Sequence, residues 1–172
     1  MKYLIVVDMQ NDFINGALGT GEAEAIVSKV AKKINDYKEE GNRVIFTRDT
    51  HSNNYLETRE GKALPVKHCI INTDGWEISD KLDTAHSTII NKPTFGSLEM
   101  IDFIKAEIET VDQIELVGVC TDICVVTNAL LLKTNFPEIP IIVDAACCAG
   151  VTPKTHQYAI ETMKMCQVKV ME

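Results

Sequence analysis

Two cysteines lie four residues apart in the stretch GVCTDICVV, where an apolar run passes into a helical pattern. Cys124 would lie in the first turn of that helix, where unpaired N–H groups and the helix dipole favour a thiolate. The backbone N–H groups of Cys120 and Cys124 could then stabilise the oxyanion that forms when a thiolate attacks a carbonyl. Packing is the alternative, because free cysteine is among the most buried residue types. The stretch by itself leaves both interpretations open.

Other reactive side chains follow apolar runs that are typical of parallel strands, namely Asp8, Asp49, His51, Lys92 and Asp144. Ligands of open α/β sheets bind outside the carboxyl ends of the strands, so these side chains could converge on one crevice. There Lys92 would lower the pKa of the Cys124 thiol, and Asp8 could take the thiol proton and later pass it to a leaving amine. Taken singly, Asp8 could merely end a strand and Lys92 could be solvated.

The elements that must position these side chains alternate along the chain. Short β-branched runs predict strands at 3–7, 44–48, 87–90, 114–119, 139–145 and 167–171, and apolar periodicity predicts helices at 26–37, 97–108 and 153–165. This alternation predicts an α/β fold, a doubly wound and mostly parallel six-stranded sheet with helices on both faces. We expect a single domain over residues 1–172, in which the long irregular stretch 49–80 is functional.

Composition excludes several classes of function. A chain of 172 residues that is 45% hydrophobic can bury a core without disulfides. The formal charge of -8 argues against a nucleic-acid or anionic-membrane partner. No apolar run reaches membrane length, and the N-terminal run is too short for a signal peptide. We therefore expect a cytoplasmic protein with a small-molecule site, whose six cysteines pack, bind metal or react rather than crosslink.

Three motifs together, VVDMQNDF, NKPTFGS and GVCTDICV, resemble in this order the cysteine hydrolases related to isochorismatase and nicotinamidase. The resemblance covers residues 3–170 and implies an isochorismatase-like fold. It implies a catalytic triad in which Cys124 is the nucleophile, Asp8 the general base and Lys92 the third member. It also implies a cis peptide bond between Val119 and Cys120, beside an oxyanion hole made by the Cys120 and Cys124 amides, and it suggests a homo-oligomer.

The loop RDTHSNNYLETREGKALPVKHC offers carboxylates and imidazoles, the ligand types of zinc, manganese or iron. An Asp-x-His pair in a polar loop is a weak signal by itself. The resemblance to nicotinamidases implies metal ligation by Asp49, His51 and His68, and we choose Glu60 as the fourth ligand, with Glu57 as a spare carboxylate. The expected cofactor is a divalent metal, zinc before manganese or iron, and the loop favours the nicotinamidase branch.

The activity implied by the resemblance is hydrolysis of a linear amide C–N bond, with nicotinamide converted to nicotinate and ammonia. Phe13 is expected to form a wall for the substrate ring. Trp76 and Phe95 are possible second walls, but we favour the core for both. Two departures from the branch leave the substrate open, because no tryptophan shortly precedes His68 and the chain is shorter than many members. The alternative is another small amide, a ureido compound or an ether.

Two readily distinguished alternatives belong to other classes. A phosphoacceptor receiver domain is also doubly wound and places a lysine and a proline, like Lys92 and Pro93, after a late strand. It leaves GVCTDICV, His51 and His68 unexplained. A catalytically inactive binding domain is the second alternative, although all three triad residue types are present. Labelling of Cys124 by a thiol reagent at neutral pH would separate an enzyme from both.

Overall fold

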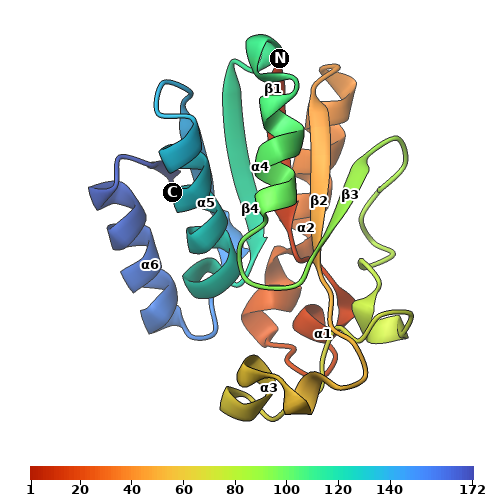
Figure 1. Ribbon diagram of the computed structural model, residues 1–172. Coiled ribbons are helices and arrows are strands. Elements are labelled where there is room, and N and C mark those ends of the chain that lie inside the picture. Colours follow the sequence, from red (N-terminus) through yellow and green to blue (C-terminus); the bar gives the residue numbers. More distant parts are fainter.

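One all-parallel sheet of six strands forms the centre of the protein, in a computed structural model that describes residues 1–172 (Figure 1). The strands are β1 (Lys2–Val7), β2 (Arg43–Asp49), β3 (Thr88–Lys92), β4 (Gln113–Val119), β5 (Ile141–Ala149) and β6 (Lys169–Met171), in the order β3-β2-β1-β4-β5-β6. The predicted doubly wound fold is confirmed. The chain builds outward from β1 in one direction and then, from β4, in the other, so the strand order reverses between β1 and β4, where such sheets bind ligands.

The helices are α1 (Asn11–Ile14), α2 (Gly21–Glu39), α3 (Arg59–Ala63), α4 (Leu98–Lys105), α5 (Val126–Asn135) and α6 (Pro153–Met165). Short 3-10 turns cover Tyr55–Glu57, Asp74–Trp76 and Ile108–Thr110, and a π-helical turn, Thr121–Val125, precedes α5. The predicted bounds of α6 are confirmed, because Thr152 caps it with Pro153 in its first turn. The predicted fifth strand is too short, since β5 continues to Ala149.

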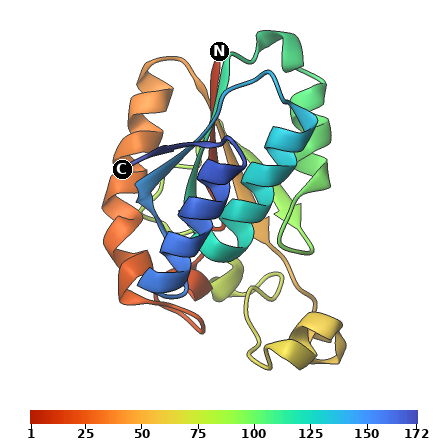
Figure 2. The same ribbon diagram turned by 90° about the vertical axis from the view of Figure 1, so that its left-hand side faces the viewer.

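Two hydrophobic cores lie on opposite faces of the sheet. One packs beneath α2, and the other packs beneath α4, α5 and α6 (Figures 1 and 2). The continuous apolar run of β1 serves both cores, since Leu4 and Val6 belong to the first and Ile5 and Val7 to the second. A rigid central strand therefore delivers the residue that follows it, Asp8, to a fixed place.

The carboxyl ends of the strands meet at one edge of the sheet, beside α1 and α3 (Figure 1). The segment containing α3 extends beyond this edge, away from the packed helices (Figure 2). The segment belongs to the long irregular stretch predicted to be functional. None of the helices combines the length and apolar character needed to span a membrane.

Candidate active site and metal centre

Lys92 is the centre of a buried ionic cluster at the carboxyl edge of the sheet. It ends β3 and lies in register with Asp49, which ends β2. Its Nζ lies 2.6 Å from Asp8 Oδ2, 3.3 Å from Asp49 Oδ1 and 3.5 Å from Cys124 Sγ. The lysine is only 1% exposed and Asp8 is fully buried. The structure thus brings together three side chains, Asp8, Lys92 and Cys124, that are up to 116 positions apart in the sequence.

Burial dominates the protonation of this cluster. It raises the pKa of Asp8 above the ordinary value, against the opposing effect of Lys92. The neighbouring carboxylates and the Cys124 thiol raise the pKa of Lys92 despite its burial. Burial also raises the pKa of the Cys124 thiol well above its usual value, and Asp8 adds to this effect while Lys92 opposes it. Lys92 lowers the thiol pKa as predicted, but desolvation of a thiolate outweighs this one ammonium group, so the net shift is opposite to the predicted one.

Asp8 retains an acceptor that can receive a proton. Its Oδ1 accepts a hydrogen bond of 2.7 Å from Thr47 Oγ1. Its Oδ2 lies 2.6 Å from the Lys92 ammonium group, and this carboxylate oxygen keeps a second lone pair that can accept a proton. A buried carboxylate oxygen of this kind, with a raised pKa, is suited to take a proton from a neighbouring group.

Cys124 lies in the π-helical turn between β4 and α5 rather than in the first turn of an ordinary α-helix. The peptide bond between Val119 and Cys120 is cis, as the resemblance implied. Gly118, with φ +119°, lets β4 approach β1, because a Cβ at this position would lie 2.1 Å from the Val7 carbonyl oxygen. The Cys120 carbonyl accepts from two amides of the turn, whereas the Cys120 N–H makes no hydrogen bond within the protein. That N–H is available to a ligand.

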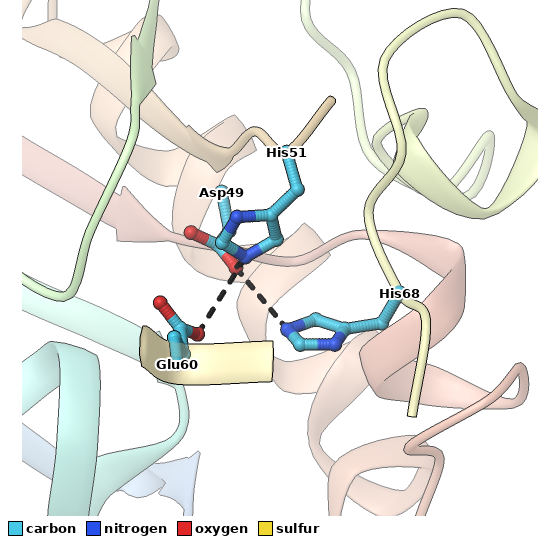
Figure 3. A group of neighbouring side chains, drawn as sticks. All are labelled: Asp49, His51, Glu60 and His68. Atoms are coloured by element: carbon cyan, nitrogen blue, oxygen red, sulfur yellow. Dashed lines mark hydrogen bonds and ion pairs between the residues drawn. The ribbon is translucent and has the colours of Figure 1, made fainter. Parts of the chain in front are cut away.

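A second group of side chains, Asp49, His51, Glu60 and His68, points toward a common centre (Figure 3). One ligand atom from each lies within 4.8 Å of all the others. Asp49 Oδ2 is 2.9 Å from His51 Nε2 and 3.5 Å from His68 Nε2, and His51 Nε2 is 3.6 Å from Glu60 Oε1. Glu60 is half-buried and the other three are buried. The two histidines keep the pKa of Asp49 well below its usual range, although its burial opposes this.

This donor set fits a divalent metal. Tetrahedral zinc with N and O ligands at about 2.1 Å separates those atoms by roughly 3.4 Å, close to the spacing found here. His68 Nδ1 lies 2.8 Å from the Val66 carbonyl oxygen, and donation to it directs the unprotonated Nε2 toward the centre. Tyr55 packs against both imidazole rings, with centroid distances of 4.7 Å to His51 and 4.9 Å to His68. The geometry thus supports the four predicted ligands as a set.

Two residues of the VVDMQNDF motif that were not predicted as site residues, Gln10 and Asp12, hold this candidate ligand group in place. Gln10, fully buried, donates from Nε2 to the Asp49 carbonyl at 2.8 Å and accepts from the Asp49 N–H at 2.7 Å. Asp12 Oδ2 accepts from the Cys69 N–H at 2.7 Å, directly after His68. The available signal was their placement beside Asp8 at the end of an apolar strand, where polar side chains reach neighbouring loops.

A cavity of about 310 Å³ connects the two groups. Cys120 and Cys124 line it together with three metal-centre residues, Asp49, Glu60 and His68. The rest of its wall is mainly apolar, from Phe13, Leu18, Leu64, Phe95, Ile123 and Val151, and neither lysine nor arginine is part of the lining. The nucleophile candidate and the candidate metal ligands therefore face one small cavity. Its walls are mainly apolar, and its only charged side chains are the acidic Asp49 and Glu60 and the imidazole of His68 when protonated.

Some of the remaining sequence predictions agree with the structure and others do not. Phe13 lines the cavity, 5.5 Å from the His68 ring between centroids, and Trp76 is buried as predicted. The prediction that Phe95 belongs to the core is wrong, because this ring is 42% exposed at the cavity wall. Asp144 does not join the site. It lies inside β5, which extends beyond the predicted end, and pairs with Lys33 of α2.

A family model described as the Isochorismatase domain matches residues 2–172. The chain belongs to this family. It is 24% identical to the nicotinamidase of Saccharomyces cerevisiae, over all of both chains. It is 28% identical to the nicotinamidase/pyrazinamidase of Mycobacterium tuberculosis, over 99% of this chain and 98% of that protein. The crystal structure of the pyrazinamidase of Pyrococcus horikoshii in complex with zinc has a TM-score of 0.87 at 30% identity, covering 99% and 98% of the two chains.

These comparisons confirm the predicted family. The protein is an isochorismatase-family hydrolase. Its likeness to proteins named nicotinamidase or pyrazinamidase extends over the whole chain. Membership also removes the receiver-domain alternative, which shares only the doubly wound topology. The particular substrate and the role of each side chain do not follow from family membership, because one fold hosts many activities.

Proposed function

We propose that the protein is a metal-containing cysteine amidohydrolase that releases ammonia from a small neutral carboxamide, with nicotinamide as the first candidate. The observation that carries this proposal is the shared cavity. It is lined by Cys124, which contacts the buried Lys92 and Asp8 pair, and by Asp49, Glu60 and His68 of the ligand group. The relatives named nicotinamidase support the choice of amide. An isochorismatase-like hydrolase of another small amide, ureido compound or ether is the alternative.

In the proposed reaction, Asp8 takes the proton of the Cys124 thiol as the sulfur attacks the carbonyl carbon. The amides of Cys120 and Cys124 stabilise the oxygen that becomes negative. The C–N bond then breaks, and Asp8 returns its proton so that ammonia leaves and a thioester remains. A water molecule attacks the thioester, Asp8 takes its proton, and the Cys124 sulfur leaves and recovers a proton. The sum is amide plus water giving carboxylic acid plus ammonia.

Lys92 is proposed to stabilise negative charge as it shifts between Asp8 and the Cys124 sulfur. Its ammonium group contacts both, at 2.6 Å and 3.5 Å, so it favours proton transfer without taking part in it. A buried ammonium group is effective here because solvent does not screen it. Asp49, the other carboxylate on Lys92, keeps the lysine fixed between the two sites.

The residues Asp49, His51, Glu60 and His68 would hold a divalent metal, zinc before manganese or iron. Such an ion, when bound, supplies a Lewis-acid position that can orient a substrate through a ring nitrogen. The chain itself sets the ligand geometry through Gln10 and Val66, whose contacts fix Asp49 and His68. Phe13 and Phe95 supply aromatic faces on which a substrate ring can pack.

The charges around the cavity favour an uncharged substrate. No lysine or arginine side chain lines the space to pair with a substrate carboxylate, and the charges of Asp49 and Glu60 would be offset by the divalent metal they hold. A volume of about 310 Å³ suits a molecule the size of a single aromatic ring with one amide.

Ammonia release from nicotinamide by the purified protein tests this proposal. We expect release that disappears on chelation and returns with zinc, manganese or iron, and that is absent in Cys124→Ala. Benzamide, which lacks the ring nitrogen, is the matched control and should react much more slowly. No release from any small neutral carboxamide, by protein shown to contain metal and a reactive Cys124, would refute the amidase assignment.

A further inference from the structure

The segment between β3 and α4, residues 93–97, connects the triad lysine with the aromatic wall of the cavity. Lys92 donates from Nζ to the Thr94 carbonyl at 3.1 Å, and Phe95 follows in the cavity lining. Gly96 packs tightly on α5, because a Cβ there would lie 2.5 Å from Leu131 Cδ1. Ser97 then caps α4 through its hydroxyl group. The segment therefore carries functional groups but contains no helix or strand of its own.

Asn128, one helical turn after Cys124, joins this segment to the nucleophile turn. Its Nδ2 donates to the Cys124 carbonyl at 2.8 Å and to the Phe95 carbonyl at 3.0 Å, while its Oδ1 accepts from the Ser97 N–H at 2.9 Å. The residue is fully buried and does not line the cavity. Both N–H groups of its side-chain amide donate and the amide oxygen accepts, so the amide has one fixed orientation.

We propose that Asn128 is a positioning residue, which sets the distance between Cys124 and Lys92 and the place of the Phe95 wall through one side-chain amide. The proposal builds on the proposed amidase function for its kinetic readouts only, since the reactivity of Cys124 can be measured without a substrate. Asn128 contacts no reacting atom. It acts by holding two backbone segments whose side chains meet in the cavity.

The physical basis is the precision that a nucleophile and its partner require. A misplacement of about 1 Å can lower a rate roughly a hundredfold when groups must be aligned for attack. Without Asn128, the 93–97 segment loses two of its bonds to α5, and Lys92 and Phe95 move with it. An unpaired Phe95 carbonyl or Ser97 N–H buried against α5 would shift toward solvent to recover a hydrogen bond.

Two substitutions separate the bonds of Asn128. Asn128→Leu keeps the approximate size and removes all three hydrogen bonds. Asn128→Thr keeps a hydroxyl group that can donate to the Cys124 carbonyl within the helix, but it does not reach the 93–97 segment. If Asn128→Leu fails to fold, Asn128→Thr carries the test by itself. Asn135→Leu is the matched control, because Asn135 of α5 also donates its amide to a carbonyl one turn earlier, that of Leu131, without joining another segment.

The first readout is the rate of Cys124 alkylation by iodoacetamide, followed by mass spectrometry of the peptide that contains it. The measurement is made well below the melting temperature of each variant, so that all are folded. We expect both Asn128 variants to react about tenfold more slowly than the unaltered protein and Asn135→Leu to react at the same rate. An alkylation rate within about twofold of the unaltered protein in Asn128→Thr would overturn the proposal, whatever its melting temperature.

The second readout separates the two effects of Asn128 with the amide substrate. We expect kcat to fall about tenfold, because Cys124 and Lys92 lose alignment, and KM to rise because Phe95 moves. In a Phe95→Ala background, Asn128→Thr should no longer raise KM but should still lower kcat. If KM rises equally in both backgrounds, Asn128 does not act through Phe95 and the proposal is wrong in that part. Failure of the amidase assignment leaves the alkylation result unaffected, so the two can be distinguished.

Discussion

Two buried clusters of this protein share one composition, a lysine between two carboxylates from neighbouring strands. At the carboxyl edge, Lys92 lies between Asp8 and Asp49. In the second cluster, Lys33 of α2 lies between Glu115 of β4 and Asp144 of β5, with Asp144 Oδ2 2.6 Å away. Both clusters neutralise acidic groups that would otherwise be desolvated without a partner.

The two clusters differ in the hydrogen-bond partners of their carboxylates and in their neighbouring groups. In the Lys33 cluster, Tyr37 donates its hydroxyl to Glu115 Oε2 at 2.6 Å, which completes the carboxylate's partners. In the Lys92 cluster, Asp8 Oδ2 contacts the Lys92 ammonium group without a further hydroxyl donor, and a thiol lies beside the lysine. Only the second cluster meets a cavity that also holds metal-ligand candidates. A buried lysine with two carboxylates is therefore no sign of catalysis by itself; a spare acceptor, a nucleophile and space for a substrate are the distinguishing features.

The largest expected fall in kcat follows removal of the nucleophile candidate, Cys124. Cys124→Ala should lower kcat by about 10⁴-fold or more, since the proposed covalent step has no substitute. Its melting temperature and metal content should stay close to those of the unaltered protein. Turnover is measured by ammonia release and folding by thermal melting. Activity retained in this variant would remove the catalytic distinction between the two clusters.

Replacing each lysine by methionine tests the comparison most directly. Lys92→Met should lower kcat/KM roughly 10²- to 10³-fold, because it removes a preorganised charge beside the nucleophile. Lys33→Met should leave kcat/KM within about twofold and lower the free energy of unfolding by about 2 kcal/mol, less than for a fully buried pair because the Lys33 side chain is 18% exposed. Activity and urea denaturation are measured on both. A catalytic loss in Lys33→Met would contradict the division.

Metal should bind beside the Lys92 cluster and not at the Lys33 cluster. His68→Ala should lower metal affinity about tenfold or more and raise KM, because it removes a ligand and a contact to Asp49. His86→Ala is the matched control, since this exposed histidine lies outside the ligand group. Metal content after dialysis, read by elemental analysis, is the measurement. Unchanged metal content in His68→Ala, together with activity that resists chelation, would refute the metal role.

The smallest expected effects are shifts along the pH axis, and they have opposite physical origins. Asp8 must be unprotonated to act as a base and its pKa is raised, so activity should be present above that pKa and be lost, as pH falls, above the range of an ordinary carboxyl group. Thr47→Val removes a bond that favours the Asp8 carboxylate and should move the acidic limb of kcat/KM to higher pH. A limb that does not move would show that another group controls it.

In the second cluster, Asp144 has a lowered pKa, since Lys33 outweighs the effect of burial. Its contribution to stability is therefore present above the ordinary carboxyl value of 3.8 and is lost as pH falls through the lower, folded-state pKa. Acid unfolding of Lys33→Met should lack this component. Melting temperatures between neutral pH and pH below that value measure the difference.

Much of the fold could be predicted from local patterns. The β1 run and the α6 helix were located because strand burial and helix capping leave direct traces in neighbouring residues. The doubly wound parallel class also followed, since parallel strands joined by helices allow few arrangements, but the strand order came only from the structure. The length of β5 could not be predicted in this way. The polar Asp144 was interpreted as marking the strand end, but the strand continues, and the Asp144 side chain pairs with Lys33.

The candidate site was predicted only in part, for a related reason. Residue types and the family resemblance indicated Asp8, Lys92, Cys124 and the candidate metal ligands, and the structure brings the members of each group close together. Their roles stay predictions. The exposure of Phe95 and the raised pKa of Cys124 depend on what surrounds each side chain, which one sequence does not give. The same holds for Gln10 and Asn128, because Gln10 bonds to Asp49, 39 positions away, and Asn128 to Phe95, 33 positions away.

The sequence by itself determined which chemical groups this protein has and on which strand ends they lie, because burial and capping act between residues close in the chain. The tertiary structure decided which lysine acts beside a nucleophile and which only completes a core. That distinction depends on the solvation and hydrogen bonding of side chains brought together from separate strands and helices, here Asp8 with Cys124 and Glu115 with Lys33. Proximity of that kind exists only after the sheet has formed.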